Sequence, residues 1–135
     1  MRLFVLAIGA FLIAGCASMG SISSLRGHGH TRVYNLPYQT VWEAVPKAMQ
    51  SLKLSVAVAD EKEGKILTDT PLTLWSYGEA IAVFVTRVDD SHTNVEVVSR
   101  KKMGTNIFAF SYQDRILDAL DKELGVQAAG QAASR

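Results

Sequence analysis

An apolar run at the N-terminus limits what the rest of the chain can fold into. Residues 3–14 are all apolar or small, and Arg2 is the only charged residue before them. A helix needs about 20 apolar residues to cross the hydrocarbon of a bilayer, and even residues 3–19 fall short of that length. A basic start, a brief apolar stretch and small residues after it are the layout of a secretory signal. The run therefore predicts a removable leader and a domain formed by the residues that follow it.

The only cysteine of the chain, Cys16, closes this run. It ends the tetrapeptide Ile13-Ala14-Gly15-Cys16, which resembles the lipobox of bacterial lipoproteins. The resemblance implies that residues 1–15 are a signal peptide that is removed, that a diacylglyceryl group is attached to the Cys16 sulfur, and that a fatty acid such as palmitate acylates the new amine. Because Ala17 follows the cysteine where an inner-membrane lipoprotein typically has Asp, the resemblance also implies the outer membrane, with the protein facing the periplasm.

Charge and cysteine content exclude several functions. The 135 residues include 14 Lys and Arg against 13 Asp and Glu, without the clustered basic residues that nucleic-acid phosphates require. A single cysteine cannot form an intramolecular disulfide and leaves too few thiolates for a structural zinc site. We therefore expect no nucleic-acid partner, no metal and no cofactor beyond the covalent lipid.

The rest of the chain divides into a tether, a domain and a tail. Residues 16–32 are rich in Ser and Gly and predict a flexible tether, residues 33–125 predict the domain, and residues 126–135 lack a core pattern and predict a disordered tail. Residues 37–53 carry an apolar stripe at helical spacing, formed by Val41, Val45, Ala48, Met49 and Leu52.

The remaining patterns predict an α+β fold. Strand-like segments at 31–36, 54–59, 65–75, 79–88 and 93–102 surround that helix, and a second apolar stripe precedes Gly125 (Ile116, Leu117, Leu120, Leu124). The order is β-α-β-β-β-β-α. Short turns between strands favour antiparallel pairing, so we expect a two-layer sandwich with both helices on one face of an antiparallel sheet.

Two histidine-containing segments could carry chemistry. His28-Gly29-His30 could be a metal pair or two solvated side chains, and no acidic residue or cysteine lies nearby to complete a ligand set. Asp89-Asp90-Ser91-His92 holds the residue types of a hydrolase triad, but adjacent residues cannot converge as a triad must, and Asp and Ser favour turns. A hydrolase or metal site would need His92 together with distant partners.

Large side chains in two connections are the candidate partner-binding residues. Trp75 and Tyr77 follow one strand segment, and Phe108 and Phe110 precede the second helix. Such residues can cover the edge of a core, or they can be the aromatic anchors that are enriched in protein interfaces. Trp42 lies beside the first helical stripe, and we expect it in the core.

A second resemblance covers about thirty residues. Val41-Trp42, Ala44-Val45, Leu52, Leu54, Val58, Asp60 and Gly64-Lys65-Ile66-Leu67-Thr68-Asp69 are similar to the repeat domain of the C-subunit lipoprotein of the outer-membrane β-barrel assembly machine. It implies a similar fold and an accessory role. We expect an anchored, non-catalytic domain that binds another envelope component; the alternative is a carrier that holds an apolar ligand such as a lipid between helices and sheet.

Overall fold

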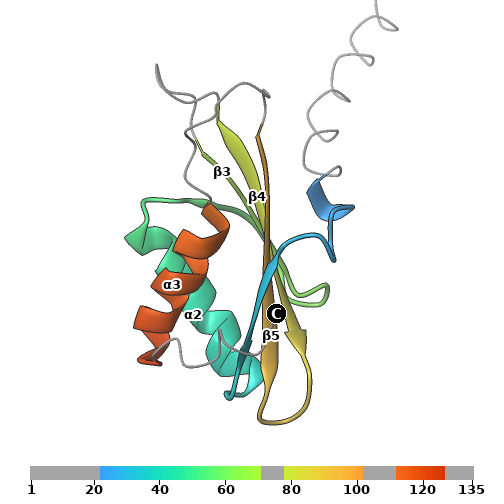
Figure 1. Cartoon of the computed structure of the whole chain (residues 1–135), viewed down its shortest axis with the longest axis vertical. Coiled ribbons are helices and arrows are strands. Elements are labelled where there is room, and N and C mark those ends of the chain that lie inside the picture. Colours follow the sequence, from blue (N-terminus) through green and yellow to red (C-terminus); the bar gives the residue numbers. More distant parts are fainter. Residues whose placement is uncertain (1–21, 71–77, 102–111, 127–135) are drawn as a thin grey trace, which may run out of the picture.

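The computed structural model describes residues 22–70, 78–101 and 112–126. In chain order the elements are β1 (His30–Tyr34), α2 (Tyr38–Ser51), β2 (Val56–Asp60), β3 (Lys65–Asp69), β4 (Glu79–Arg87), β5 (Thr93–Lys101) and α3 (Tyr112–Leu124). The predicted α+β class and the order β-α-β-β-β-β-α are confirmed. Figure 1 shows α2 and α3 side by side on one face of the sheet.

The sheet has five strands in the order β1-β5-β4-β3-β2, and every neighbouring pair is antiparallel. Strands that follow one another directly, from β2 to β5, lie beside one another, as short connections favour. The exception is β1, which is separated from β2 by α2 and pairs with β5 instead, placing Arg32 opposite Val95. The first strand therefore lies next to the last one.

The helix α2 contributes its apolar stripe to the core. It begins after Pro37, whose backbone φ of −60° suits the start of a helix. Val41, Val45, Ala48 and Met49 have no exposed surface, and each buried side chain of this kind contributes roughly 1–3 kcal/mol. Trp42 is also buried, as expected.

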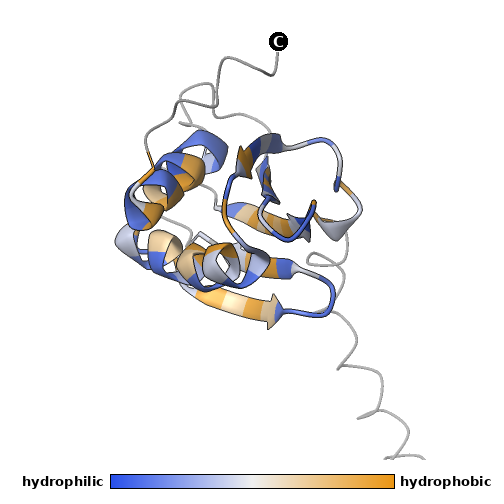
Figure 2. Cartoon of the chain, turned by 90° about the horizontal axis from the view of Figure 1, so that it is seen from below, coloured by the Kyte–Doolittle hydropathy of each residue, from blue (hydrophilic) through white to orange (hydrophobic). Residues whose placement is uncertain are grey.

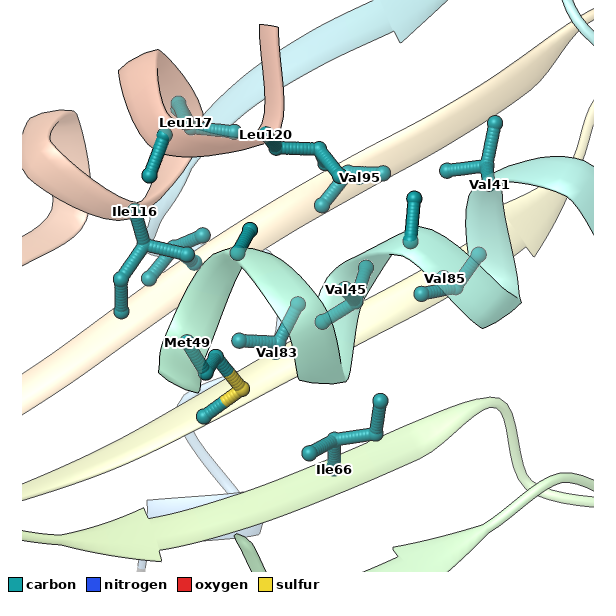
Figure 3. Packing of buried hydrophobic residues seen from close by; sticks show 14 of the residues in the cluster. Val41, Val45, Met49, Ile66, Val83, Val85, Val95, Ile116, Leu117 and Leu120 are labelled. Atoms are coloured by element: carbon teal, nitrogen blue, oxygen red, sulfur yellow. The ribbon is translucent and has the colours of Figure 1, made fainter. Parts of the chain in front are cut away.

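The second helix packs beside the first over the same face. Figure 3 shows Ile116, Leu117 and Leu120 of α3 directed toward the space that α2 and the sheet side chains also fill. Both helices carry bands of hydrophobic and hydrophilic residues in Figure 2, the pattern of a helix with one buried and one exposed side. Gly125 follows α3 with a φ of +65°, the left-handed conformation that commonly ends a helix.

A buried ion pair joins the first strand to the last helix. Arg32 and Asp121 have side chains that are 6% and 9% exposed, and Nη1 of Arg32 donates to Oδ2 of Asp121. The other carboxylate oxygen accepts a hydrogen bond of 2.8 Å from the hydroxyl of Tyr34. Both oxygens of Asp121 are therefore partnered, which a buried charge requires. Asp118, whose side chain is 61% exposed, accepts a longer bond of 3.3 Å from Arg32.

The same cluster alters the titration of its members. Burial raises the pKa of the Tyr34 hydroxyl above its ordinary value, and the hydrogen bond to the Asp121 carboxylate raises it further. Burial alone lowers the pKa of Arg32, but its hydrogen bond and attraction to Asp121 outweigh this effect and raise the pKa. Tyr34 therefore stays protonated as a donor, and Arg32 stays charged.

Replacing the buried carboxylate should destabilise the domain far more than replacing its exposed neighbour. Asp121→Ala leaves the Arg32 charge buried without its main partner, so we expect the free energy of unfolding to fall by about 3–5 kcal/mol. Asp118→Ala removes only an exposed partner and should cost about 1 kcal/mol or less. Urea denaturation of the two variants measures the difference, and equal costs would contradict the assigned role of Asp121.

Candidate functional site

The face of the sheet that points away from the helices, here called the outer face, is also apolar at its centre. Leu67, Ala80, Ala82, Phe84 and Val98 form a second buried cluster on it. Residues 22–29, here called the strap, cover this cluster with Ile22, which is 1% exposed, and with Leu25. Figure 1 shows the strap, in blue, across the sheet from the two helices. The sheet is therefore covered on both faces.

The carboxylate of Glu96 holds the strap in place. The backbone N–H groups of Gly27 and Gly29 both donate to its Oε1 atom, at 2.7 and 2.8 Å. Glu96 is only 6% exposed, although it lies in the middle of β5. Hydrogen bonds to a charged acceptor each contribute about 1.5–3 kcal/mol. The two bonds explain why an acidic residue occupies this position of the sheet.

Two further contacts fix the position of the strap. The guanidinium of Arg26 lies 4.9 Å from the ring centre of Phe84, and its Nη2 donates to Thr86 Oγ1 at 3.0 Å. Gly29 approaches the sheet so closely that a Cβ atom there would lie 2.4 Å from the Val97 carbonyl oxygen. A side chain at Gly29 would therefore push the strap away from β5.

The strap changes the boundaries expected from the sequence. The tether was expected to extend to residue 32 and the domain to begin at residue 33, whereas residues 22–29 pack on the sheet and β1 begins at His30. Five residues, 17–21, separate Cys16 from the strap. The Ser- and Gly-rich composition hid the strap, because its glycines serve a fixed backbone here and not flexibility: Gly27 has a φ of +93°, and Gly29 lies close to β5. The three-residue spacing of Ile22 and Leu25 was the available signal.

The candidate partner-binding residues Trp75, Tyr77, Phe108 and Phe110, and the lipidation residue Cys16, lie outside the described residues. The strands that flank the two aromatic segments are described. In register, Asp69 of β3 pairs with Ala80, and Glu79 pairs with Lys101 of β5. The end of β3, the start of β4 and the end of β5 therefore lie at one end of the sheet, so both aromatic-bearing connections leave from that end.

The turn that contains His92 does not have the geometry of a triad. His92 Nδ1 lies 2.8 Å from Asp89 and 3.1 Å from the Ser91 hydroxyl, so the acid and the hydroxyl share one ring nitrogen. A catalytic histidine uses one nitrogen for the acid and the other for the nucleophile. The backbone N–H of Ser91 also donates to Asp89, and this bond, followed by that from His92, lowers the pKa of Asp89. These contacts stabilise the connection between β4 and β5.

The other histidines do not form a metal site in the described part of the chain. His30 Nδ1 lies 2.8 Å from Asp114 Oδ1, linking β1 to α3 at the surface. Within residues 22–70, 78–101 and 112–126, no group of three His, Cys, Asp or Glu side chains could hold a metal ion. Across the same ranges, no helix is long and apolar enough to cross a membrane.

Two surface hollows that share Tyr38 lie near the turn between β2 and β3. Both are lined by Tyr38, Glu61, Lys62 and Arg87, and the Arg87 guanidinium lies 5.6 Å from the Tyr38 ring centre. Tyr38 stacks on Trp42 with ring centres 6.0 Å apart. Both hollows are open to solvent and carry the charged side chains of Glu61, Lys62 and Arg87, so they differ from the closed apolar cavity that a lipid carrier needs. The carrier alternative stays a prediction.

Known proteins were compared with the chain by sequence and by structure. No family model and no curated protein matches the chain. Among solved structures, the chain is similar to the adenylate sensor from AMP-activated protein kinase, crystallised in complex with 5-aminoimidazole-4-carboxamide 1-β-D-ribofuranotide, with a TM-score of 0.49 and 14% sequence identity. The match covers 68% of this chain and 94% of the sensor chain. At this level of similarity, the ligand of the sensor says nothing about the ligand of this chain.

Removing the carboxylate that holds the strap should release it. In Glu96→Ala, the amides of Gly27 and Gly29 lose their acceptor, so we expect their hydrogen exchange to accelerate about 10- to 100-fold, the equivalent of losing about 1.4–2.8 kcal/mol of protection. Glu43→Ala, which removes an exposed carboxylate of α2 that accepts a hydrogen bond from Gln39, should leave these rates unchanged. Unaltered exchange in Glu96→Ala would show that Glu96 does not hold the strap.

Proposed function

We propose that the protein is an outer-membrane lipoprotein whose small α+β domain faces the periplasm and binds another envelope component without catalysing a reaction. The observation that carries this proposal is the tetrapeptide Ile13-Ala14-Gly15-Cys16 directly after a short apolar leader. A leader of this length is removable, and the residues before the cysteine fit the lipobox at every position. The proposal assigns the domain a binding role, in keeping with the accessory role implied by the second resemblance.

The proposed anchor is strong for a physical reason. Each buried CH₂ group of an acyl chain contributes about 0.8 kcal/mol, so one chain binds a membrane reversibly while several hold it stably. A diacylglyceryl group on the Cys16 sulfur and an acyl group on its amine supply three chains. Attachment at Cys16 therefore needs no further membrane-binding element in the domain.

The chain between the anchor and the folded residues is short. Residues 17–21 and the bond to Ile22 span about 20 Å at full extension, since an extended chain advances about 3.3–3.6 Å per residue. Ile22 of the strap already packs on the sheet, so the proposed anchor holds the domain next to the head groups. A partner would therefore be another component at the membrane surface.

The proposed partner surface is at the end of the sheet from which both aromatic-bearing connections leave. Strand register puts Asp69, Glu79 and Lys101 together there, and Trp75, Tyr77, Phe108 and Phe110 follow within the two connections. Trp and Tyr are over-represented among the residues that dominate interface energetics. Two separate segments that leave from one end can contribute to one surface.

Mass spectrometry of protein from its native host tests the anchor. We expect a mature chain that begins at Cys16 and carries diacylglyceryl and acyl groups, and Cys16→Ala should abolish both the lipid and the membrane association. Ala17→Asp should move the lipidated protein to the inner membrane, whereas the matched control Ala17→Ser should not. An unmodified thiol behind an intact leader would contradict the proposal.

Site-directed cross-linking in cells tests the partner surface. A photoreactive amino acid in place of Trp75 or Phe108 should trap the same envelope component, because both segments leave from one end of the sheet. The same amino acid in place of Lys47, on the exposed side of α2, should not trap it. Absence of a specific adduct at both aromatic positions would contradict a binding role for this surface.

A further inference from the structure

We propose that the domain lies on the membrane with the outer face of its sheet toward the lipid head groups and its helices directed away. This inference rests on the proposed anchor at Cys16 and goes beyond it, because it names the surface that meets lipid. It commits to a lipid bilayer as the occupant of the outer face.

The entry point of the chain is fixed on the outer face. Ile22 is the first described residue, and it is buried against Leu67, Phe84 and other side chains of that face. Glu96 holds the next turn of the strap through Gly27 and Gly29. A chain coming from the membrane therefore reaches the domain on the side opposite the helices, as Figure 1 shows for the strap.

The thickness of the fold then excludes the opposite orientation. Packed layers lie about 10 Å apart, and a helix is about 10–12 Å across with its side chains. Two layer spacings and half the width of a helix put the far side of the helical layer about 25 Å from the strap, measured through the body of the domain. A path around the edge of the sheet is longer still. About 20 Å of extended chain after Cys16 cannot bring the helices to the head groups while the strap is docked.

The rim of the outer face has the chemistry of a membrane-facing surface. Val33 is 54% exposed and lies between Arg32 and Tyr34, which point toward α3, so strand alternation places it on the outer face. Val58, which is 38% exposed and opposite Leu67, is on the same face. Neither helix contributes a large exposed hydrophobic residue within the described residues.

Exposed basic groups lie on this face as well. Arg26 belongs to the strap, and Arg100 pairs in register with Ala80, a member of the outer cluster. Each basic residue close to an anionic bilayer contributes about 1 kcal/mol. The acidic Glu96 is covered by the strap and bonded to its amides, while Asp60 at the end of β2 accepts the Glu63 N–H at 3.1 Å. The face therefore carries two exposed valines and two arginines at its surface, one of which, Arg26, also contacts Phe84 and Thr86, together with the Asp60 carboxylate at the end of β2.

Photo-cross-linking to lipid tests the orientation. A diazirine amino acid replaces either Val33 on the outer face or Gln50 on the exposed side of α2 in the full chain, in vesicles of phosphatidylethanolamine and phosphatidylglycerol. We expect lipid adducts at Val33 to exceed those at Gln50 several-fold. Equal yields, a higher yield at Gln50, no lipid adduct at Val33, or protein adducts in place of lipid at Val33 would each overturn the proposal.

Release of the strap provides the matched control. In Glu96→Ala the strap is released and the chain between Cys16 and the sheet becomes longer, so the ratio of lipid adducts at Val33 to those at Gln50 should fall toward one. Glu43→Ala should leave this ratio unchanged. Circular dichroism confirms that both variants retain their helices. A preference that Glu96→Ala leaves unchanged would overturn the role given to the strap.

The mass of the Cys16 peptide from the same samples separates the two proposals. If Cys16 carries no lipid, the proposed function fails, and the orientation is then measured on the full chain coupled through its single thiol to vesicles that contain a maleimide lipid. A higher yield of lipid adducts at Val33 than at Gln50 in those vesicles supports the proposed orientation, and any other result overturns it.

Discussion

The fold depends on burial of the central strand β4 on both of its faces. Ile81, Val83 and Val85 point to the helices and are buried, while Ala80, Ala82 and Phe84 point the other way and are also buried. A sheet whose second face is apolar must cover that face, since large exposed apolar patches are rare on monomeric proteins. The strap provides this cover. The strap also lies just after the proposed lipid attachment residue. Covering the outer face therefore stabilises the sheet and also determines on which side of the domain the chain from Cys16 enters.

The parts of the fold that depend on local periodicity could be predicted from the sequence. The stripes Val41–Val45–Met49 and Ile116–Leu120 specify amphipathic helices with a 3.6-residue repeat, and turns between adjacent strands specify antiparallel neighbours. The place of β1 beside β5 could not be predicted in this way, because it depends on pairing between residues separated by most of the chain.

The contacts that could not be predicted from the sequence also join residues that are far apart along the chain. Glu96 acts on backbone N–H groups of Gly27 and Gly29, which no side-chain pattern reveals. The buried charges of Arg32 and Asp121 neutralise each other, although the two residues are 89 positions apart. In its own segment, each residue resembles an ordinary surface charge. The aromatic residues of the two connections were proposed from composition alone, and strand register now places the starts of both connections at one end of the sheet.

The pairing of the first strand with the last has a consequence for the order of folding. During synthesis or export from the N-terminus, His30–Tyr34 emerges early, yet its strand partner Thr93–Val97 and its ionic partner Asp121 emerge last. Contacts of such long range form late and slow the folding of a chain. The emerging polypeptide cannot complete its sheet before β5 (Thr93–Lys101) is available. This topology therefore favours an unfolded chain during export through a narrow channel.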